Sequence, residues 1–463
     1  GNERIIARYC HLHPYVEPDA LRQVLKYRPA HFRWAGCDTF NVTDMEGKRQ
    51  VVVIETNSCP SGQKSMPVLR DVDEEGGYRR LIESTFAELL KEAKTDGVLA
   101  VVYDKNLMEA SGYASVLADL AKEQVREQVS VEFAWDEAIV TSWQVYLVEY
   151  YVSDSSPPVR WTEDKIMQIR TPEGEWKNVR AAFRYVTQRP WTRFPVSAKT
   201  LVLNPVSFTL LPCTPFPLGE CLLLRSPRGC PLLVWLGPQI LPCLAGGRNK
   251  MVASKAYNFY NADLQAKHTG LSIRLPETVH DVRKVEVPLW VKSFGGHAVV
   301  KVPYSNAGQG VYTILSQKEL DEFMAEDHHY EKFIVQSLIG KTNIGARILV
   351  CHLPATPCFI PFSPVSFANL EFSWGMLGTN LSVKLDDLTW DTEAQRLLLM
   401  DRKDFNTLGL GLDDLIEAYV QTVLATIAID RMCKRLTNED GSFNLELFRS
   451  LNDDPALLDE IML

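Results

Sequence analysis

Three side chains that could bind a divalent cation lie close together in the first part of the sequence. Asp38 lies in a predicted strand over 32–42, and Glu55 and Asn57 lie at the end of a second one over 49–56. The polar hairpin turn between these strands places Asp38 beside Glu55, and residues two apart share a strand face. Carboxylate and amide oxygens suit Mg²⁺, which completes its shell with phosphate oxygens and waters. The pattern predicts a magnesium site, with a solvated strand end as the alternative.

A second group of residues has the chemistry of a phosphate-binding loop. The strand at 298–302 carries Lys301 and runs into a loop with Ser305, Gly308 and Gly310. Glycines let backbone N–H groups approach phosphate oxygens, and a lysine adds a point charge on the same anion. The loop lacks the GxxxxGK[ST] pattern, and it does not open a helix after GxGxxG. An ordinary turn after a strand is the alternative.

Strands and helices alternate along most of the chain that must position these groups. The order strand 97–103, helix 110–127, strand 129–133 indicates a parallel, doubly wound layer, so that the predicted fold class is α/β. A hairpin over 165–185 turns at Pro172-Glu-Gly174. Further helices are expected over 18–28, 77–94, 318–325 and 412–435, and further strands over 332–336 and 346–350. Residues 32–57 should pair in one sheet with the strands near 346–350 and 375–400, despite their separation in sequence.

Residues 207–243 differ from the rest of the chain. These 37 residues hold seven of the 26 prolines, four of the ten cysteines and three charges, without helical or strand periodicity. Such a long structureless loop is improbable in a compact domain. A hydrophobic lid is one interpretation. The other is a retained intron, because Val206-Ser207 can be encoded by a splice-donor-like hexamer and Cys243-Leu244-Ala245 by a pyrimidine tract before CTAG. In that case the segment should project and be poorly packed.

Composition narrows the class of protein. The 463 residues are 46% hydrophobic and carry a formal net charge of −9, which disfavours non-specific binding to nucleic acid. No run of 18 apolar residues predicts a membrane span, and the sequence opens without a signal-peptide pattern. The ten cysteines form no CxxC pair. A reducing, cytoplasmic location is therefore expected, with no nucleic-acid or membrane partner.

Five motifs together resemble the ATP-grasp superfamily. The metal-binding end is matched by Asp38 and by Ile54-Glu55-Thr-Asn57-Ser-Cys-Pro-Ser-Gly62, and the phosphate loop by Lys301 and its glycines. Phe333-Ile-Val-Gln336-Ser337 resembles the segment that links the two ATP-binding lobes. Arg347 stands where the superfamily often has an arginine facing the phosphates. Leu203-Asn-Pro and Leu244-Ala-Gly-Gly-Arg-Asn-Lys250 resemble the earlier lysine segment, in which Lys255 is an alternative to Lys250.

The order of the motifs is permuted, because the Glu-x-Asn strand comes first instead of closing the domain. This arrangement resembles the eukaryotic glutathione synthetases. Two features depart from that family: Ser305 and Asn306 stand where it has a glutamate ligand for magnesium, and the chain shows no glycine-rich C-terminal lid.

The resemblance implies a set of site residues. Asp38, Glu55 and Asn57 would hold magnesium, and Lys301 and Arg347 would be catalytic. Substrate contacts are expected from Arg33, Ser58, Ser61 and Arg184. ATP would be bound by Lys250, Lys301, Ser305, Gly308, Gly310, Gln336, Ser337, Arg347 and Asn380.

The resemblance also implies a domain order and a reaction. It places metal-binding strands at 1–66, a pre-ATP-grasp-like α/β domain at 67–206, the irregular insertion at 207–243, a nucleotide-binding lobe at 244–330, a second ATP-grasp lobe at 331–436 and a tail at 437–463. The implied activity is an ATP- and Mg²⁺-dependent, ADP-forming ligase that joins a small carboxylate to an amine through an acylphosphate, amino acids and peptides being candidate substrates. A small-molecule kinase and an inactive nucleotide-binding scaffold are the alternatives. The oligomeric state is left open.

Overall fold

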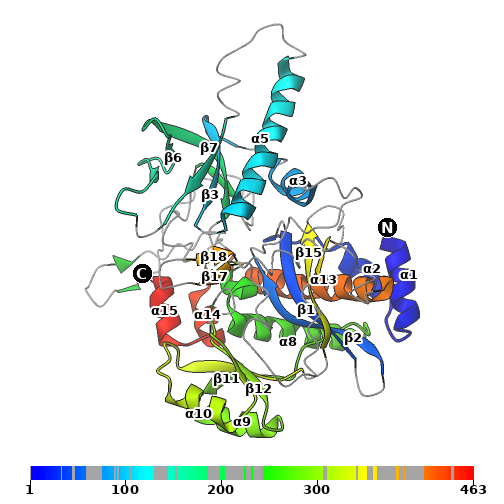
Figure 1. The fold of residues 1–463 in the computed structure, drawn as a ribbon. Coiled ribbons are helices and arrows are strands. Elements are labelled where there is room, and N and C mark those ends of the chain that lie inside the picture. Colours follow the sequence, from blue (N-terminus) through cyan, green and yellow to red (C-terminus); the bar gives the residue numbers. More distant parts are fainter. Residues whose placement is uncertain are drawn as a thin grey trace.

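The computed structural model describes most of the chain (Figure 1). The described residues are 2–32, 34–43, 47–58, 76–87, 90, 93–104, 106–129, 144–151, 154–185, 199–203, 224–225, 231–232, 241, 243–305, 310–339, 342–351, 358–361, 382–384, 390–392, 411–439 and 443–462. Within these, only the backbone is described for 76, 124–129, 224–225, 231–232, 342–351, 358–361, 382–384, 390–392 and 459–462.

The N-terminal hairpin forms part of a sheet with strands from much later in the chain. The sheet has the order β16-β15-β1-β2 and is antiparallel. Its strands are β1 (Trp34–Thr43), β2 (Arg49–Asn57), β15 (Thr342–Cys351) and β16 (Cys358–Pro361). The predicted pairing of the hairpin with 346–350 is confirmed (Figure 1).

The prediction that strands near 375–400 join this sheet is wrong for the described residues there. The strands β17 (Ser382–Lys384) and β18 (Trp390–Thr392) pair with each other in a separate two-stranded sheet. They are neighbours in sequence, so pairing with each other costs less loop-closure entropy than pairing with a distant strand.

The long helix α13 (Leu412–Arg435) lies against the first sheet and has the predicted bounds. It also contacts α1 (Asn2–Leu12), α2 (Pro18–Leu25) and α8 (Lys250–Ala266). Because neighbours cover it on several sides, most of its residues are buried, including the polar Gln421 and Asp430. Arg8 of α1 forms two hydrogen bonds of 2.7 and 2.6 Å with Asp413 in its first turn.

A second antiparallel sheet carries the predicted phosphate loop. It has the order β11-β14-β12-β13, with β11 (Thr278–Arg283), β12 (Ala298–Lys301), β13 (Val311–Ile314) and β14 (Lys332–Ser337). The helices α9 (Val287–Ser293) and α10 (Gln317–Ala325) pack on this sheet. The 3₁₀ turn Lys284–Glu286 leads into α9, and Ser316 caps α10. The predicted strands at 298–302 and 332–336 and the helix at 318–325 are confirmed. The helices α14 (Leu445–Leu451) and α15 (Pro455–Met462) complete this side of the molecule (Figure 1).

A third sheet contains the predicted parallel layer. Its strands are β3 (Val98–Tyr103), β4 (Val145–Glu149), β5 (Val159–Trp161), β6 (Met167–Arg170), β7 (Trp176–Tyr185) and β8 (Leu201–Leu203). The strand β3 runs parallel to β4 and β7, and β7 runs parallel to β8. The hairpin of β6 and β7 turns at the predicted glycine, Gly174 (φ +87°). The α/β class and the parallel layer are thus confirmed.

Two elements of this layer differ from the prediction. The helix α5 (Leu107–Val129) includes Val129, the first residue of the strand expected over 129–133, and the rest of that strand lies outside the described residues. The described parallel partners of β3 are β4 and β7. The helix expected over 77–94 is α3 (Gly76–Ile82), followed by a π-helical turn over Glu83–Ala87. Thr85 Oγ1 donates to the Leu81 carbonyl at 2.7 Å, a back-bond typical of distorted helices.

The end of the irregular segment packs against the core instead of projecting. Leu241 and Cys243 are both buried, and Cys243–Gly247 forms a π-helical turn that leads into α8. The expectation of poor packing is therefore wrong for these two residues. The strands β9 (Leu224–Arg225) and β10 (Pro231–Leu232) pair in a sheet of their own, and the remainder of 207–243 lies outside the described residues.

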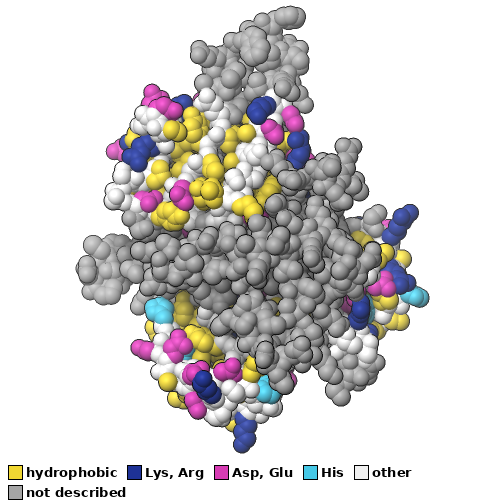
Figure 2. All heavy atoms as spheres, viewed as in Figure 1, with side chains coloured by type: hydrophobic (Ala, Val, Ile, Leu, Met, Phe, Trp, Pro, Cys, Tyr) yellow, Lys and Arg dark blue, Asp and Glu magenta, His cyan; other side chains and the backbone are white. Residues whose placement is uncertain are grey.

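The described surface is mixed in charge on the face seen in Figure 2, where acidic and basic side chains are interspersed over the upper and lower parts. Among the described helices, none is both long and apolar enough to cross a membrane.

Candidate functional site

The predicted metal-binding and phosphate-binding residues meet where β2, α8 and β12 come together. Asp38 and Glu55 are directly paired between β1 and β2, next to a register irregularity at Asp38/Thr39. Lys250, the first residue of α8, has its Nζ 3.7 Å from Glu55 Oε2. The same Nζ donates to Ser305 Oγ at 2.9 Å and to the Ser305 carbonyl at 3.0 Å. A lysine thus links the strand of Glu55 to the predicted phosphate loop.

The start of α8 is fixed by its neighbours. The Asn249 side chain caps the helix by accepting from the Val252 N–H at 3.1 Å. The Lys250 N–H donates to the Pro303 carbonyl at 2.8 Å, and Asn249 forms an isolated bridge with Tyr304. The first turn of α8 is therefore held against the chain that follows Lys301, which sets where Lys250 lies.

Lys301 is 6% exposed, at the end of β12. Burial lowers its pKa to about 8, the Glu55 and Asp38 carboxylates oppose this, and the Lys250 ammonium adds to it. Four charged side chains from four elements, Asp38, Glu55, Lys250 and Lys301, thus interact electrostatically in one place. Two cations and two carboxylates are a suitable set for an anion that carries a divalent metal.

Contacts with α8 and with the turn before it hold the end of β2 in place. Thr56 Oγ1 shares a 2.7 Å hydrogen bond with Tyr257 OH of α8, and burial raises the pKa of Tyr257. Ser58, predicted to contact substrate, is buried: its N–H donates to the Gly247 carbonyl at 3.3 Å and its hydroxyl lies 3.3 Å from Cys243 Sγ. These contacts anchor the strand end that carries Glu55 and Asn57.

Asn57 completes the predicted ligand set. Its Nδ2 is buried and has no hydrogen-bond partner among the described residues. The described part of the chain holds no group of three His, Cys, Asp or Glu side chains arranged as metal ligands. The predicted set here consists of two carboxylates and one amide.

Arg347 lies beside this group by register. Its Cα is paired with that of Asp38 on the side of β1 away from β2, and only its backbone is described. The predicted residues Arg33, Ser61, Gly308 and Asn380 lie outside the described residues, as does Asn306.

Gln336 and Ser337 end β14 on the neighbouring sheet. Gln336 is paired with Val299, while Lys301 is paired with Ile334, so Gln336 is two positions along the ladder from the lysine. The Gln336 amide donates to Thr278 Oγ1 at 2.9 Å, and the Ser337 N–H donates to the Glu277 carbonyl at 2.8 Å.

Gly310 closes the phosphate loop. Its carbonyl accepts from the Val302 N–H at 2.8 Å, and its φ is +62°. A Cβ at this position would lie 2.2 Å from Val302 Cγ2. Tight closure of the turn therefore accounts for the glycine at this position.

Arg184 lies on a different sheet, on β7 beside Val102 of β3, and is buried. The first and third sheets meet through Trp34, which packs in the same core as Phe183 and Tyr185. The start of β1 and the strand of Arg184 thus share one hydrophobic core.

Lys255, the alternative to Lys250, is used elsewhere. Its Nζ lies 2.7 Å from Asp281 Oδ2 and donates to the Leu451 carbonyl at 2.5 Å. Sequence reasoning missed α8 as a helix and with it Asn249, although an asparagine before a helical run is a capping pattern.

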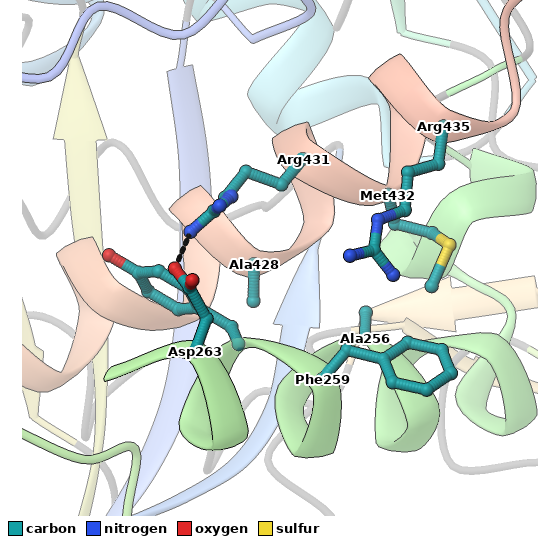
Figure 3. A pocket seen from close by; sticks show the side chains of 8 residues that line it. Ala256, Phe259, Asp263, Ala428, Arg431, Met432 and Arg435 are labelled. Carbon is teal, nitrogen blue, oxygen red and sulfur yellow. Dashed lines mark hydrogen bonds and ion pairs between the residues drawn. The ribbon is translucent and has the colours of Figure 1, made fainter. Parts of the chain in front are cut away.

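An open surface pocket lies away from these residues, between α8 and α13 (Figure 3). It has about 270 Å³ of empty space. Arg435 lies over the ring of Phe259, and Arg431 bonds to Asp263 at 2.6 Å. None of the predicted site residues lines it.

Comparison with known proteins gives structural matches alone. Neither a protein-family model nor a curated protein matches the sequence. Among the solved structures that match this one are those of three ATP-grasp proteins.

The three matches are distant, each with 10% sequence identity. One is the D-alanyl-alanine synthetase A of Vibrio cholerae, with a TM-score of 0.30 over 55% of this chain and 68% of that one. Another is a glutathione synthetase-like effector, GSS30, of Globodera pallida in its apo form, with a TM-score of 0.36 over 78% of this chain and 81% of that one. The third is a RimK domain protein ATP-grasp of Sphaerobacter thermophilus, with a TM-score of 0.29 over 55% of this chain and 85% of that one. TM-scores this low do not by themselves support a function for this chain.

Proposed function

We propose that the chain is an ATP- and Mg²⁺-dependent ligase that joins a carboxylate to an amine and releases ADP and phosphate. The observation that carries this proposal is the grouping of Asp38, Glu55, Lys250 and Lys301 from four separate elements. A buried lysine and a second lysine beside paired carboxylates suit a metal-bound triphosphate.

The residues present fit such a group. Asp38 and Glu55 offer carboxylate oxygens, and Asn57 offers an amide oxygen. The Nδ2 of Asn57, unpartnered among the described residues, would donate to a phosphate oxygen. These residues would hold Mg²⁺, which when bound would offset the negative charge of the phosphates. Lys250 and Lys301 would neutralise the remaining phosphate charge, and Arg347, whose Cα is paired with that of Asp38, would assist them.

The reaction proposed has two steps. A carboxylate oxygen of the substrate attacks the γ-phosphorus, and the bond to ADP breaks. The amine then attacks the carbonyl carbon of the acylphosphate, forming the amide, while phosphate leaves and a proton is released. The chain's contribution is to position the reactants and to stabilise charge. Arg33 and Arg184 are proposed to orient the carboxylate, because arginine makes bidentate contacts with it.

The test is the dependence of ADP release on both substrates. The purified chain is incubated with Mg-ATP and pools of small carboxylic acids, with and without pools of amines, and ADP and free phosphate are measured. A ligase releases both products only when acid and amine are present together. ADP without free phosphate, accompanied by a stable phosphorylated product, would show a kinase instead. Magnesium-dependent ATP binding without turnover in any pool would support the inactive scaffold.

A further inference from the structure

The C-terminal segment contacts the elements that carry the candidate ATP-binding residues. The helix α14 packs against α8, and the Leu451 carbonyl at its end accepts a hydrogen bond from Lys255 of α8. The same lysine pairs with Asp281 of β11, so one side chain links the tail, α8 and the second sheet. Sequence analysis assigned no role to this tail.

Asn452 contacts the residue that begins α8. Its Nδ2 donates to Asn249 Oδ1 at 3.4 Å, and both side chains are at most 1% exposed. Asn249 Oδ1 is also the acceptor that caps α8 through the Val252 N–H. Asn249 directly precedes Lys250, so this contact lies one residue from the candidate ATP-binding lysine.

Asp454 contacts the start of β14. Its Oδ2 accepts from the N–H groups of Glu331 and Lys332 at 2.9 and 3.2 Å, and its Oδ1 accepts from that of Ala456 at 3.1 Å. The carboxyl is fully buried. Burying a carboxylate is costly unless hydrogen bonds compensate, and three backbone donors do so here.

We propose that Leu451, Asn452 and Asp454 form a C-terminal clamp, in which Asn452 and Asp454 are positioning residues for ATP binding. Asn452 fixes the first turn of α8, and with it Lys250, while Asp454 fixes β14, which ends in Gln336 and Ser337. Lys250 lies on α8 and Lys301 on β12. The start of α8 binds the chain after β12, and Lys255 of α8 pairs with Asp281 of the same sheet. The clamp adds a further connection, through the tail, and so preorganises the site. This inference rests on the proposed function.

The test compares Asn452→Ala with two controls in the full chain, using calorimetric titration with Mg-ATP. Asn452→Ala should raise the Kd about tenfold, which corresponds to about 1.4 kcal/mol. Leu457→Ala truncates a fully buried leucine of α15 and should lower Tm at least as much, while its Kd stays within about twofold of wild type. Asp453→Ala removes an exposed carboxylate that pairs with Lys332 at 2.5 Å and should leave the Kd unchanged. Wild-type affinity in Asn452→Ala, or an equal loss in Leu457→Ala, would overturn the proposal.

A second measurement needs no nucleotide and separates this inference from the proposed function. In Asn452→Ala, amide hydrogen exchange at 250–253 should accelerate about tenfold or more, while that of α13 stays unchanged. If the wild type binds no ATP but hydrogen exchange changes as predicted, the proposed function is wrong and the contact between the clamp and α8 is confirmed. If the wild type binds ATP and exchange at 250–253 is unaffected, the clamp is wrong.

Discussion

Lys250 Nζ lies 3.7 Å from Glu55 Oε2, so the first residue of α8 faces the second strand of the chain. The lysine side chain is 12% exposed and that of the glutamate 32%. Their contact joins the N-terminal hairpin to α8. It is the point at which the predicted metal ligands and phosphate ligands become one site.

Replacement of Lys250 tests its role as a phosphate ligand. Lys250→Met should weaken Mg-ATP binding about 10- to 100-fold, because a hydrogen bond to a charged group contributes about 1.5–3 kcal/mol. Lys267→Met removes a more exposed lysine just beyond the other end of α8, which pairs with Asp263, and should bind Mg-ATP like the wild type. Equal affinities for all three proteins, measured by titration calorimetry, would contradict the assignment.

The lowered pKa of Lys301 predicts a pH dependence of stability. Burial lowers this pKa from its ordinary value of 10.5 to about 8. Between these values the unfolded chain holds a proton that the folded chain has released, so the contribution of Lys301 to the free energy of unfolding rises with pH. The rise should be on the order of 3 kcal/mol.

Denaturant titrations at pH 7.5, 9 and 10 (roughly spanning the titration range of lysine) provide the check. The difference in unfolding free energy between wild type and Lys301→Met should grow in favour of the wild type over this range. Lys318→Met, which removes an exposed lysine of α10, is the matched control and should show a constant difference. A constant difference for Lys301→Met as well would show that Lys301 titrates normally.

The parts of the site that the sequence could predict are those fixed by local geometry. A hairpin places Asp38 opposite Glu55 once both strands and their turn are recognised. An apolar run at helical spacing, with acidic residues in its first turn and basic residues in its last, predicts α13 with its observed bounds. The side chains of Lys250 and Ser305 meet only because the start of α8 binds the chain after β12. That contact joins distant segments, and no local pattern encodes it.

Three places differ from what the local sequence pattern predicts. Val129 has strand propensity but ends the long helix α5, and Thr85, in the π-helical turn after α3, bonds back to the Leu81 carbonyl. The segment before α8 was interpreted as an insertion up to Cys243, yet Leu241 and Cys243 are buried. The amino-acid composition of the segment did not predict that its last residues are buried in the core.

The burial of Leu241 and Cys243 predicts how deletions of the irregular segment will behave. Joining Val206 to Leu241 keeps both buried side chains, and joining Val206 to Leu244 removes them. The shorter deletion should be more stable by about 1.5–3 kcal/mol, the value of burying a leucine. Urea unfolding of the two proteins gives the comparison, and equal or reversed stability would show that this end of the segment contributes nothing to the core.

Tyr27 and Asp430 anchor the N-terminal region to α13. Tyr27 OH donates to the fully buried Asp430 carboxylate at 2.6 Å, and the His31 N–H donates to the same group at 2.7 Å. Tyr27→Phe should lower the free energy of unfolding by about 1.5–3 kcal/mol, because it removes a donor from a buried charge. Tyr15→Phe, at a 60% exposed tyrosine, should cost about 0.5 kcal/mol or less in the same urea titration. Equal effects of the two changes would rule out this anchor.

The most direct test of the site is the binding of ATP with and without Mg²⁺ to the wild type and to Glu55→Gln. The substitution keeps the shape of the side chain and removes the charge that faces Lys250 and the proposed metal. The wild type should bind ATP much more tightly with Mg²⁺. Glu55→Gln should lose most of that dependence, and its turnover should fall about 100-fold, equivalent to about 2.7 kcal/mol. Wild-type binding in Glu55→Gln, with the same dependence on Mg²⁺, would contradict a metal–nucleotide site at the end of β2.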